Sequence, residues 1–297
     1  MTQSSFGGNW TSDKLLYLKK YLDAYTTALK KQRFELLYID AFAGTGWLTL
    51  KQNQVEQSEL PLFSFGAPPS REEDFSINSM EGSARIALHI EPSFNEYIFI
   101  EKDAKRFSTL ENLRTEFPEQ KITCINRDAN SYIKKICDSH DWLRAGHRAV
   151  LFLDRFGMSV NWDTINSIAN TKAIDLWYLF PLGVALNRLL KKNGEISGAH
   201  KRRINQLLGS EDWYDIFYEV TVKENLFGKS SETVKTADFS QIARYIVSRF
   251  EDVFEGVAPN PKMLRNKKNN PLYLLIFASG NPKGSKIAVK IAQNILK

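Results

Sequence analysis

Four carboxylate side chains end, or closely follow, short apolar runs of strand length in this 297-residue sequence. They are Asp40 after the run 36–40, Glu101 at the end of "EYIFIE" (96–101), Asp128 just past "KITCIN" (121–126) and Asp154 at the end of "RAVLFLD" (148–154). In an open parallel sheet, ligands bind beyond the carboxyl ends of the strands, so these acids would line one crevice. Carboxylates accept hydrogen bonds from defined directions. Glu101 would hold a pair of ribose hydroxyls, Asp128 the exocyclic amine of adenine, and Asp40 the amino group of an amino-acid-like cofactor. For Asp128 and Asp154, the cap of a helix or a place in a turn is the alternative role.

Two glycines follow the first acid, in "DAFAGTG" (40–46). Gly44 and Gly46 would let backbone N–H groups approach a ligand closely, since glycine has no Cβ to collide with it. The dinucleotide fingerprint GxGxxG is incomplete because position 49 is Thr, and the next strand-end acid is Glu101, beyond a long insertion. A Walker A sequence is absent as well. The pattern therefore favours an amino-acid-bearing nucleoside over a dinucleotide, and it argues against an NAD-dependent oxidoreductase and against an NTPase.

Alternating strand-like and helix-like segments would bring these residues together. A helix of about 20 residues begins near Thr11 or Ser12. The predicted strands are 36–40, 96–101, 121–126, 148–154 and 173–180, and the helices among them are 104–116, 129–139 and 161–170. Two late strands, "DVFEGVA" (252–258) and 271–280, joined by a basic loop, predict an antiparallel pair, and a last helix starts near Gly284. The predicted fold is α/β: a Rossmann-like, mostly parallel sheet of the class I methyltransferase type with an antiparallel C-terminal hairpin, an N-terminal helix and a helical insertion.

We expect one domain over residues 1–297. Residues 47–80 separate the glycines from the next helix, and an insertion of this length in a compact domain is typical of a lid. Its prolines and aromatic residues suit a lid over the crevice, with a packed peripheral loop as the alternative. Residues from about 183 to 252 are predicted to form a mostly helical subdomain that would be the substrate wall.

With the acids and glycines placed, the chain resembles the three-Cys-motif partner proteins, a class I, S-adenosylmethionine-dependent methyltransferase-like family. The matching pieces are "YIDAFAGTG", "GSARIAL" (82–88), "FIEKDAKRFSTLENL" (99–113), "RDANSYI" (127–133), "LFLDRFGMSVNWDTI" (151–165) and "LYLLIFASGNPKGSKIA" (272–288). They are spread over most of the chain. The resemblance implies S-adenosylmethionine as the cofactor and a functional partner protein that carries three cysteines.

The resemblance also implies roles for individual residues. Asp40, Gly44 and Gly46 would form the cofactor loop, Glu101 would bind the ribose, and Asp128 would face the adenine. In "DRFG" (154–157), Asp154 and Phe156 would form the catalytic pair, the acid accepting a hydrogen bond from the target amine and the aromatic ring stacking on a base. The sequence departs from the family pattern at Arg155, where the family has proline, so the pocket would bind an amine in a different way. Arg155 would instead contact a phosphate or pair with a neighbouring acid.

Charge is concentrated in two stretches, "KKNGEISGAHKRR" (191–203) and "KMLRNKKNN" (262–270), within a chain of net charge +6. Such clusters attract polyanions. Nucleic acid is therefore a candidate partner, bound through Lys201, Arg202, Arg203, Lys267 and Lys268. A solvated, solubilising surface is the alternative.

Other classes of protein find little support. The two cysteines, Cys124 and Cys137, are too few for a disulfide framework and read as reduced core thiols, and the four histidines are scattered, so we expect no metal site. The N-terminus has no signal-peptide pattern and no run is apolar enough to span a bilayer, so we expect a cytoplasmic protein with no membrane partner.

Two hypotheses about function remain. The first is an S-adenosylmethionine-dependent methyltransferase acting on nucleic acid or on another amine-bearing substrate. The second is a catalytically inactive Rossmann-like module that binds nucleic acid or a protein partner in a multi-gene system, such as a defence system. Binding of the cofactor discriminates between them.

Overall fold

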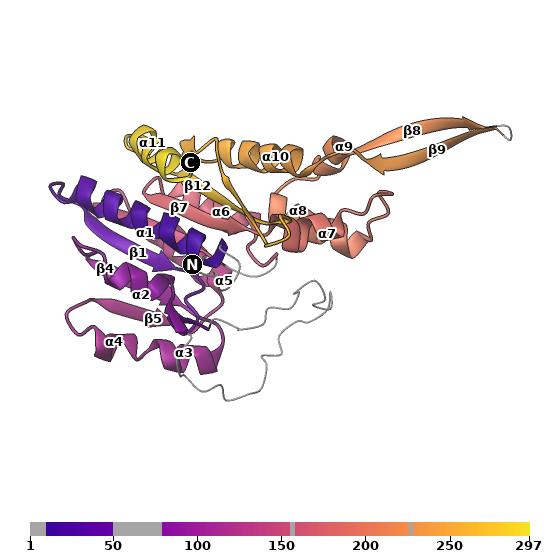
Figure 1. Ribbon diagram of the computed structural model, residues 1–297. Coiled ribbons are helices and arrows are strands. Elements are labelled where there is room, and N and C mark those ends of the chain that lie inside the picture. Colours follow the sequence, from indigo (N-terminus) through magenta and orange to yellow (C-terminus); the bar gives the residue numbers. More distant parts are fainter. Residues whose placement is uncertain (1–9, 50–78, 155–157, 226–227) are drawn as a thin grey trace, which may run out of the picture.

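The computed structural model, drawn in Figure 1, describes residues 10–49, 79–154, 158–225 and 228–297. An eight-stranded sheet, counted over these residues, has the order β10-β12-β7-β6-β1-β4-β5, and β11 also pairs with β12. The strands are β1 (Glu35–Asp40), β4 (Glu96–Ile100), β5 (Ile122–Ile125), β6 (His147–Leu153), β7 (Ile174–Phe180), β10 (Gly256–Val257), β11 (Lys262–Arg265) and β12 (Pro271–Ser279).

The direction of the strands confirms the predicted fold class. Strands β5, β4, β1, β6 and β7 are parallel, whereas β12 is antiparallel to β7 and to both β10 and β11. From β1 the chain builds outward to β4 and β5, then crosses back to add β6 and β7 on the other side. The order of strands therefore reverses between β1 and β6, which is where ligands bind in open sheets of this kind.

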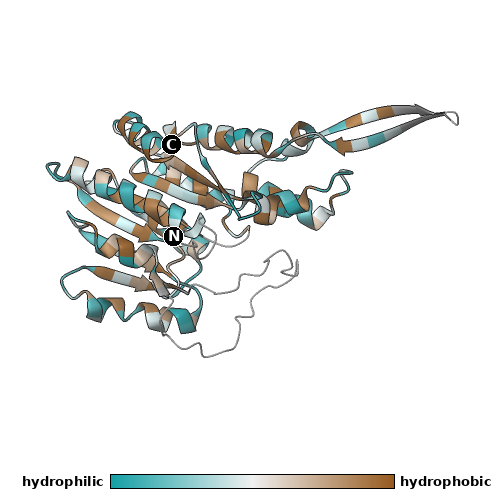
Figure 2. Ribbon diagram, in the orientation of Figure 1, coloured by the Kyte–Doolittle hydropathy of each residue, from teal (hydrophilic) through white to brown (hydrophobic). Residues whose placement is uncertain are grey.

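Both faces of the sheet are covered, which explains why its strands are apolar throughout (Figure 2). Leu36 and Tyr38 pack on one face, and Leu37 and Ile39 on the other. The first face packs against α1 (Trp10–Leu29), α2 (Ser83–Leu88), α3 (Ala104–Leu110), α4 (Leu113–Glu116) and α11 (Ser285–Ile295). The second packs against α5 (Ala129–Ser139), α6 (Trp162–Asn170), α8 (Gly198–Leu208) and α10 (Phe239–Glu251).

Helix α1 forms where the N-terminal helix is predicted, and its apolar stripe lies against the sheet. A buried polar contact fixes its position, because the Tyr21 hydroxyl donates to a carboxylate oxygen of Asp175 on β7 at 2.7 Å. Burial raises the pKa of Asp175 to about 6, although hydrogen bonds from Ser279 and Tyr21 act in the opposite direction. This hydrogen bond and the buried Leu18 and Leu22 together hold α1 against the sheet.

The block 183–252, predicted to be mostly helical, contains several helices and also a β-hairpin that was not predicted. It includes a π-helical turn (Leu182–Leu186), α7 (Asn187–Leu189), α8, α9 (Trp213–Phe217) and α10, together with the antiparallel strands β8 (Tyr218–Asn225) and β9 (Gly228–Lys235). The hairpin projects from the body of the molecule (Figure 1), and Val220 and Val222 are 68% and 62% exposed. Tyr218, the first residue of β8, is buried in the core, whereas the two valines that follow on the same face of the strand lie in solvent.

Two smaller predictions need correction. The predicted strand 252–258 does pair antiparallel with β12, but only over Gly256–Val257. The antiparallel partner of β12 across the basic loop is β11, which begins inside the stretch assigned to that loop, while 252–258 contributes only the short β10. The helix predicted over 104–116 is two helices, α3 and α4, separated by a turn.

The insertion begins and ends in a short antiparallel ladder, β2 (Trp47–Thr49) with β3 (Ser79–Glu81). The lid predicted for residues 47–80 falls mainly on 50–78, outside the described residues. Of the helices in the described part of the chain, none has the length and apolar content that a bilayer span requires.

Candidate functional site

The chain leaving β1 is held between the ends of its two neighbouring strands. The Ala41 N–H donates to the carbonyl oxygen of Phe152 at the end of β6 at 3.1 Å, and the Ala43 N–H donates to that of Ile100 at the end of β4 at 3.0 Å. The turn that follows Asp40 therefore lies across the carboxyl edge at the point where strand order reverses. This is the position at which sheets of this class bind nucleotide-like ligands.

Both glycines of the turn adopt left-handed backbone conformations, with φ of +62° at Gly44 and +80° at Gly46. Other residues would be strained there by roughly 1–2 kcal/mol. A Cβ built on Gly44 meets no atom within 4 Å, so the space beside this residue is open. Glycine is required here by the backbone conformation, and the turn presents its main chain to that open space.

The turn is also closed against the far end of the insertion. The Gly82 N–H donates to the Gly46 carbonyl oxygen at 3.0 Å, and a Cβ on Gly82 would lie only 3.0 Å from that oxygen. Ser83, the next residue, starts α2 and donates its hydroxyl hydrogen to Asp40 at 2.5 Å. Two segments that are distant in sequence thus meet at one acid.

Asp40 is fully buried, and both of its carboxylate oxygens are engaged. One accepts from Ser83, and the other accepts from the Phe42 N–H at 3.1 Å. Burial raises the pKa of Asp40 to about 7; these two hydrogen bonds lower it, the nearby Asp154 raises it and Lys14 lowers it. The carboxyl group therefore supports the turn from inside the protein, and it titrates near neutral pH.

A buried ion pair stands at the end of β6, where Lys14 of α1 donates to Asp154. The side chain of Lys14 is 4% exposed and that of Asp154 is 17% exposed, and the Lys14 ammonium lies 5.2 Å from the Trp10 ring. Trp10 in turn packs on Tyr273 of β12, with ring centroids 5.0 Å apart. The N-terminal helix thus delivers a cation to the acid predicted to lie at the reacting centre.

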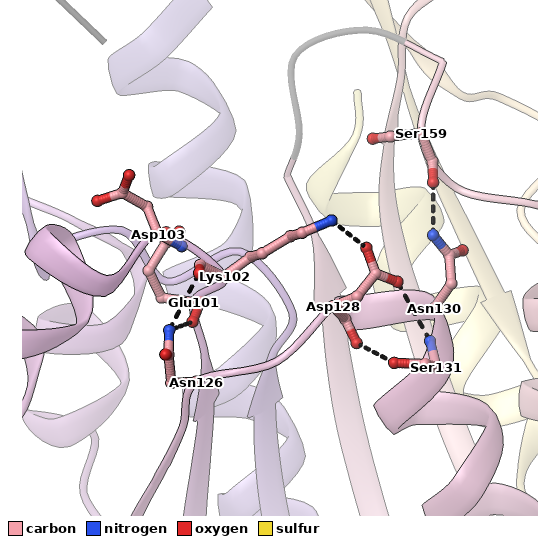
Figure 3. A network of polar contacts seen from close by, with 8 residues as sticks. All are labelled: Glu101, Lys102, Asp103, Asn126, Asp128, Asn130, Ser131 and Ser159. Atoms are coloured by element: carbon pink, nitrogen blue, oxygen red, sulfur yellow. Dashed lines mark hydrogen bonds and ion pairs between the residues drawn. The ribbon is translucent and has the colours of Figure 1, made fainter. Parts of the chain in front are cut away.

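Glu101 and Asp128 lie at the ends of the next two strands and belong to a second network (Figure 3). Glu101 accepts from the Asp103 N–H at 2.8 Å, and Asn126 donates to the carbonyl oxygens of Glu101 and Lys102. The Lys102 side chain reaches across to the Asp128 carboxylate at 3.4 Å. The ends of β4 and β5 are therefore joined by polar contacts on the same edge as the glycine turn.

Asp128 is the N-cap of α5, the alternative role that the sequence left open. Its carboxylate accepts from the Ser131 N–H at 3.3 Å. The same carboxylate also pairs with Lys102. To bind adenine as well, Asp128 would have to accept a hydrogen bond from the base while keeping these two contacts. That role stays a prediction.

The predicted site residues fall into two neighbouring groups. Asp40 and Asp154 interact electrostatically and share Lys14 as a neighbour, whereas Glu101 lies with Asp128 through Lys102. The glycine turn lies between the two groups. Phe156, the second predicted catalytic residue, and Arg155 lie outside the described residues.

Sequence reasoning missed Lys14 and Ser83. Lys14 had a visible signal, because it occupies the apolar stripe of α1 with Leu18 and Leu22, where a lysine is out of place. Ser83 stands inside the "GSARIAL" segment, but only the fold shows that this segment returns to Asp40.

No protein-family model matches the sequence, and no curated protein is significantly similar to it. Several solved structures resemble it at low sequence identity. A protein from Legionella pneumophila str. Philadelphia 1 is 12% identical, with a TM-score of 0.46 over 98% of this chain and 92% of that chain. An S-adenosylmethionine-dependent methyltransferase from Clostridium acetobutylicum ATCC 824 is 9% identical, with a TM-score of 0.37 over 88% and 91% of the two chains. TehB from Haemophilus influenzae is 9% identical, with a TM-score of 0.32 over 86% of this chain and 60% of that chain.

Proposed function

We propose that this protein is an S-adenosylmethionine-dependent methyltransferase that acts on an amine nitrogen. One observation carries the proposal: a left-handed glycine turn, supported by a buried acid, crosses the point where strand order reverses in a sheet whose β12 is antiparallel to β7. The acid and the turn are adjacent in sequence, and Gly82 and Ser83, which hold them, come from beyond the insertion. The described residues at that place fit an amino-acid-bearing nucleoside.

The fit rests on particular groups. The main chain beside Gly44 faces open space, so it would receive the amino-acid end of the cofactor. Glu101 is half-buried at the end of β4 and would accept from the ribose hydroxyls. Asp40 has both oxygens bonded within the protein, so its contribution would be to hold the turn in place. The cofactor, when bound, supplies an electrophilic methyl group.

Asp154 and Lys14 would act on the acceptor. A nitrogen that receives a methyl group becomes positively charged as the new bond forms, and a carboxylate held beside it stabilises that charge. Lys14 would keep Asp154 in one position, where its carboxylate could accept a hydrogen bond from the amine. Beyond that, the protein has to align donor and acceptor and exclude water.

Calorimetry with S-adenosylmethionine and S-adenosylhomocysteine tests the proposal. We expect the wild-type protein to bind both, and Glu101→Ala to weaken binding at least about tenfold, since one lost hydrogen-bonded carboxylate costs about 1.5–3 kcal/mol. Glu101→Gln retains an acceptor for the Asp103 N–H, so it should lose affinity while melting at the wild-type temperature. Glu119→Ala, a change at an exposed acid elsewhere, is the control. If the wild-type protein binds neither compound at high protein concentration, the proposal fails.

A catalytically inactive binding module is the second candidate, and one observation favours it. The acid assigned to the acceptor is already paired with Lys14, so an acceptor amine has to compete for the same carboxylate. A protein that binds the cofactor yet transfers no labelled methyl group to a mixture of DNA, RNA and protein would fit this second candidate. Such a module would act through a partner, for which the family resemblance suggests a protein with three cysteines.

A further inference from the structure

The two basic clusters, far apart in sequence, meet on the same edge of the sheet as the candidate site. α7 and α8 follow the carboxyl end of β7, whereas the loop 266–270 leads into the start of β12. Since β12 runs antiparallel to β7, with Leu274 opposite Phe180, the start of one strand lies beside the end of the other. Figure 1 shows the β11–β12 loop next to α7 and α8.

A close backbone contact joins the roots of the two clusters. A Cβ added to Gly183, just after β7, would lie 1.8 Å from the carbonyl oxygen of Pro271, the first residue of β12. Five residues after Gly183 the chain reaches Arg188, and three residues before Pro271 lies Lys268. The two clusters therefore start from a single point, and we expect them to form one surface.

We call this the basic surface. It comprises Arg188, Lys191, Lys192, Lys201, Arg202, Arg265, Lys267 and Lys268, all of them exposed.

The basic surface adjoins the reacting end of the candidate site. Tyr273 of β12 is buried, and its pKa is raised mainly by burial, then raised further by the charge of Asp154 and lowered by that of Arg188. A single hydroxyl thus feels both the acid of the candidate site and the first arginine of the basic surface. Tyr273 also packs on Trp10, whose ring lies 5.2 Å from the Lys14 ammonium that pairs with Asp154, so the start of β12 and Asp154 are linked by direct contacts.

The distribution of charge identifies the kind of ligand. Segments 182–203 and 262–270 contain ten basic residues and one acid, Glu195, whereas the rest of the chain has more acidic than basic residues. The whole positive excess of the protein is gathered on this edge. Repeated, closely spaced positive charges match a ligand with repeated negative charges, such as a phosphate backbone.

Stacking contributes little here, because the neighbouring aromatic ring is occupied. The Lys201 ammonium lies 4.3 Å from the centroid of the Tyr214 ring, and the Tyr214 hydroxyl donates to the Gly194 carbonyl oxygen. With this ring covered, the surface would contact the backbone of a nucleic acid and not its bases. Its binding would be insensitive to sequence and sensitive to salt.

We infer that the basic surface binds the phosphates of a single-stranded nucleic acid and delivers an unpaired base to Asp154. The inference rests on the proposed function, since it names the substrate class of that site. A single strand is favoured because an enzyme that acts on a base needs it out of the stack, and an unpaired base reaches the site without the cost of flipping.

Fluorescence anisotropy with labelled single strands of about 20 nucleotides, measured over a range of salt concentrations, tests the inference. The variant K201A/R202A/K267A/K268A should bind at least about tenfold more weakly at physiological salt, and the slope of log K against log salt should flatten by about 3, since each lost phosphate contact removes about 0.7. The control K20A/K135A/K286A/K290A removes four exposed lysines elsewhere and should keep most of the wild-type affinity and slope.

The pairs K201A/R202A and K267A/K268A, tested separately, examine whether the two clusters act as one surface. Each pair should weaken binding. If only one pair does so, if the control loses as much as the test variant, or if affinity ignores salt, the inference is overturned. Tighter binding of a duplex of the same sequence would overturn the single-strand assignment.

Calorimetry with S-adenosylhomocysteine separates this inference from the proposed function. The variant K201A/R202A/K267A/K268A should bind S-adenosylhomocysteine as the wild-type protein does. Nucleic-acid binding by a protein that binds no cofactor would leave the phosphate surface standing and refute the methyltransferase assignment. Cofactor binding without nucleic-acid binding would refute the phosphate surface and leave the methyltransferase assignment standing.

Discussion

Replacing Asp40 by asparagine should make the protein more stable at high pH relative to wild type. The folded pKa of Asp40 is about 7, against 3.8 for an ordinary aspartate, because the carboxyl group is fully buried. Between these two pH values the folded state binds more protons than the unfolded state, so this group lowers the stability of the protein as the pH rises. A difference of 3.2 pKa units corresponds to about 4 kcal/mol.

The asparagine variant removes this dependence while keeping the shape of the side chain. Its amide oxygen can accept from the Phe42 N–H, and its NH₂ group can donate to Ser83, whose hydroxyl accepts as well as donates. We therefore expect the difference in unfolding free energy, Asp40→Asn minus wild type, to rise by about 4 kcal/mol between pH 4 and pH 8.

Urea unfolding at several pH values, followed by tryptophan fluorescence, measures this difference. Asp175→Asn serves as a comparison, because burial raises the pKa of Asp175 only to about 6. The difference in unfolding free energy between this variant and wild type should rise by about 3 kcal/mol with pH, and it should level off at a lower pH than for Asp40→Asn. A flat curve for Asp40→Asn, or one that falls with pH, would refute the account of this acid.

The same variant distinguishes two roles for Asp40 in cofactor binding. If the carboxylate only supports the glycine turn, the asparagine variant should bind S-adenosylhomocysteine within about tenfold of wild type, because the hydrogen bonds to the turn are kept. A loss of more than about a hundredfold would instead show that Asp40 pairs directly with the amino group of the ligand.

Three further predictions concern the surroundings of the site. Lys14→Met leaves the Asp154 carboxylate without its buried partner, so the free energy of unfolding in urea should fall by about 3 kcal/mol, and an unchanged value would contradict this. Tyr21→Phe removes a hydrogen bond to Asp175, so the free energy of unfolding should fall by about 2 kcal/mol at pH 8. The loss should be smaller at pH 5, where Asp175 is protonated, and urea unfolding at pH 5 and pH 8 tests this difference. Gly46→Ala forces an alanine into a left-handed conformation, so thermal unfolding should reveal a loss of about 1–2 kcal/mol, and an unchanged melting temperature would show that the turn can relax.

The sequence predicted the central strands closely, because burial on both faces leaves a continuous apolar run. The predicted ranges for β1, β4, β5, β6 and β7 differ from the observed ones by no more than one residue at either end. The hairpin β8–β9 was missed although Tyr218, Val220 and Val222 alternate with polar residues in β8, because the stretch was assigned to the helical block around it. Its fold follows from pairing between the two strands, which a single-segment pattern does not reveal.

For the site, the sequence located the acids but not their partners. The position of Asp154 at a strand end was readable, whereas the pairing with Lys14 joins residues 140 positions apart. Asp128 illustrates a different limit, since a cap and a cofactor ligand look identical in sequence. That Asp40 would be fully buried, with both oxygens satisfied by the protein, could not be deduced without knowing that the segment after the insertion returns to it.

The hydrogen bond between Gly46 and Gly82, together with the β2–β3 ladder, has a consequence for the evolution of this chain. Everything between Thr49 and Ser79 is inserted between two points that the protein already holds together, so changes in its length alter the closure entropy only logarithmically, by about 0.6 kcal/mol for each doubling. We expect homologous chains to vary most in length here while the glycine turn and Ser83 keep their places. The two ends of the insertion would then stay joined whatever the length of chain between them.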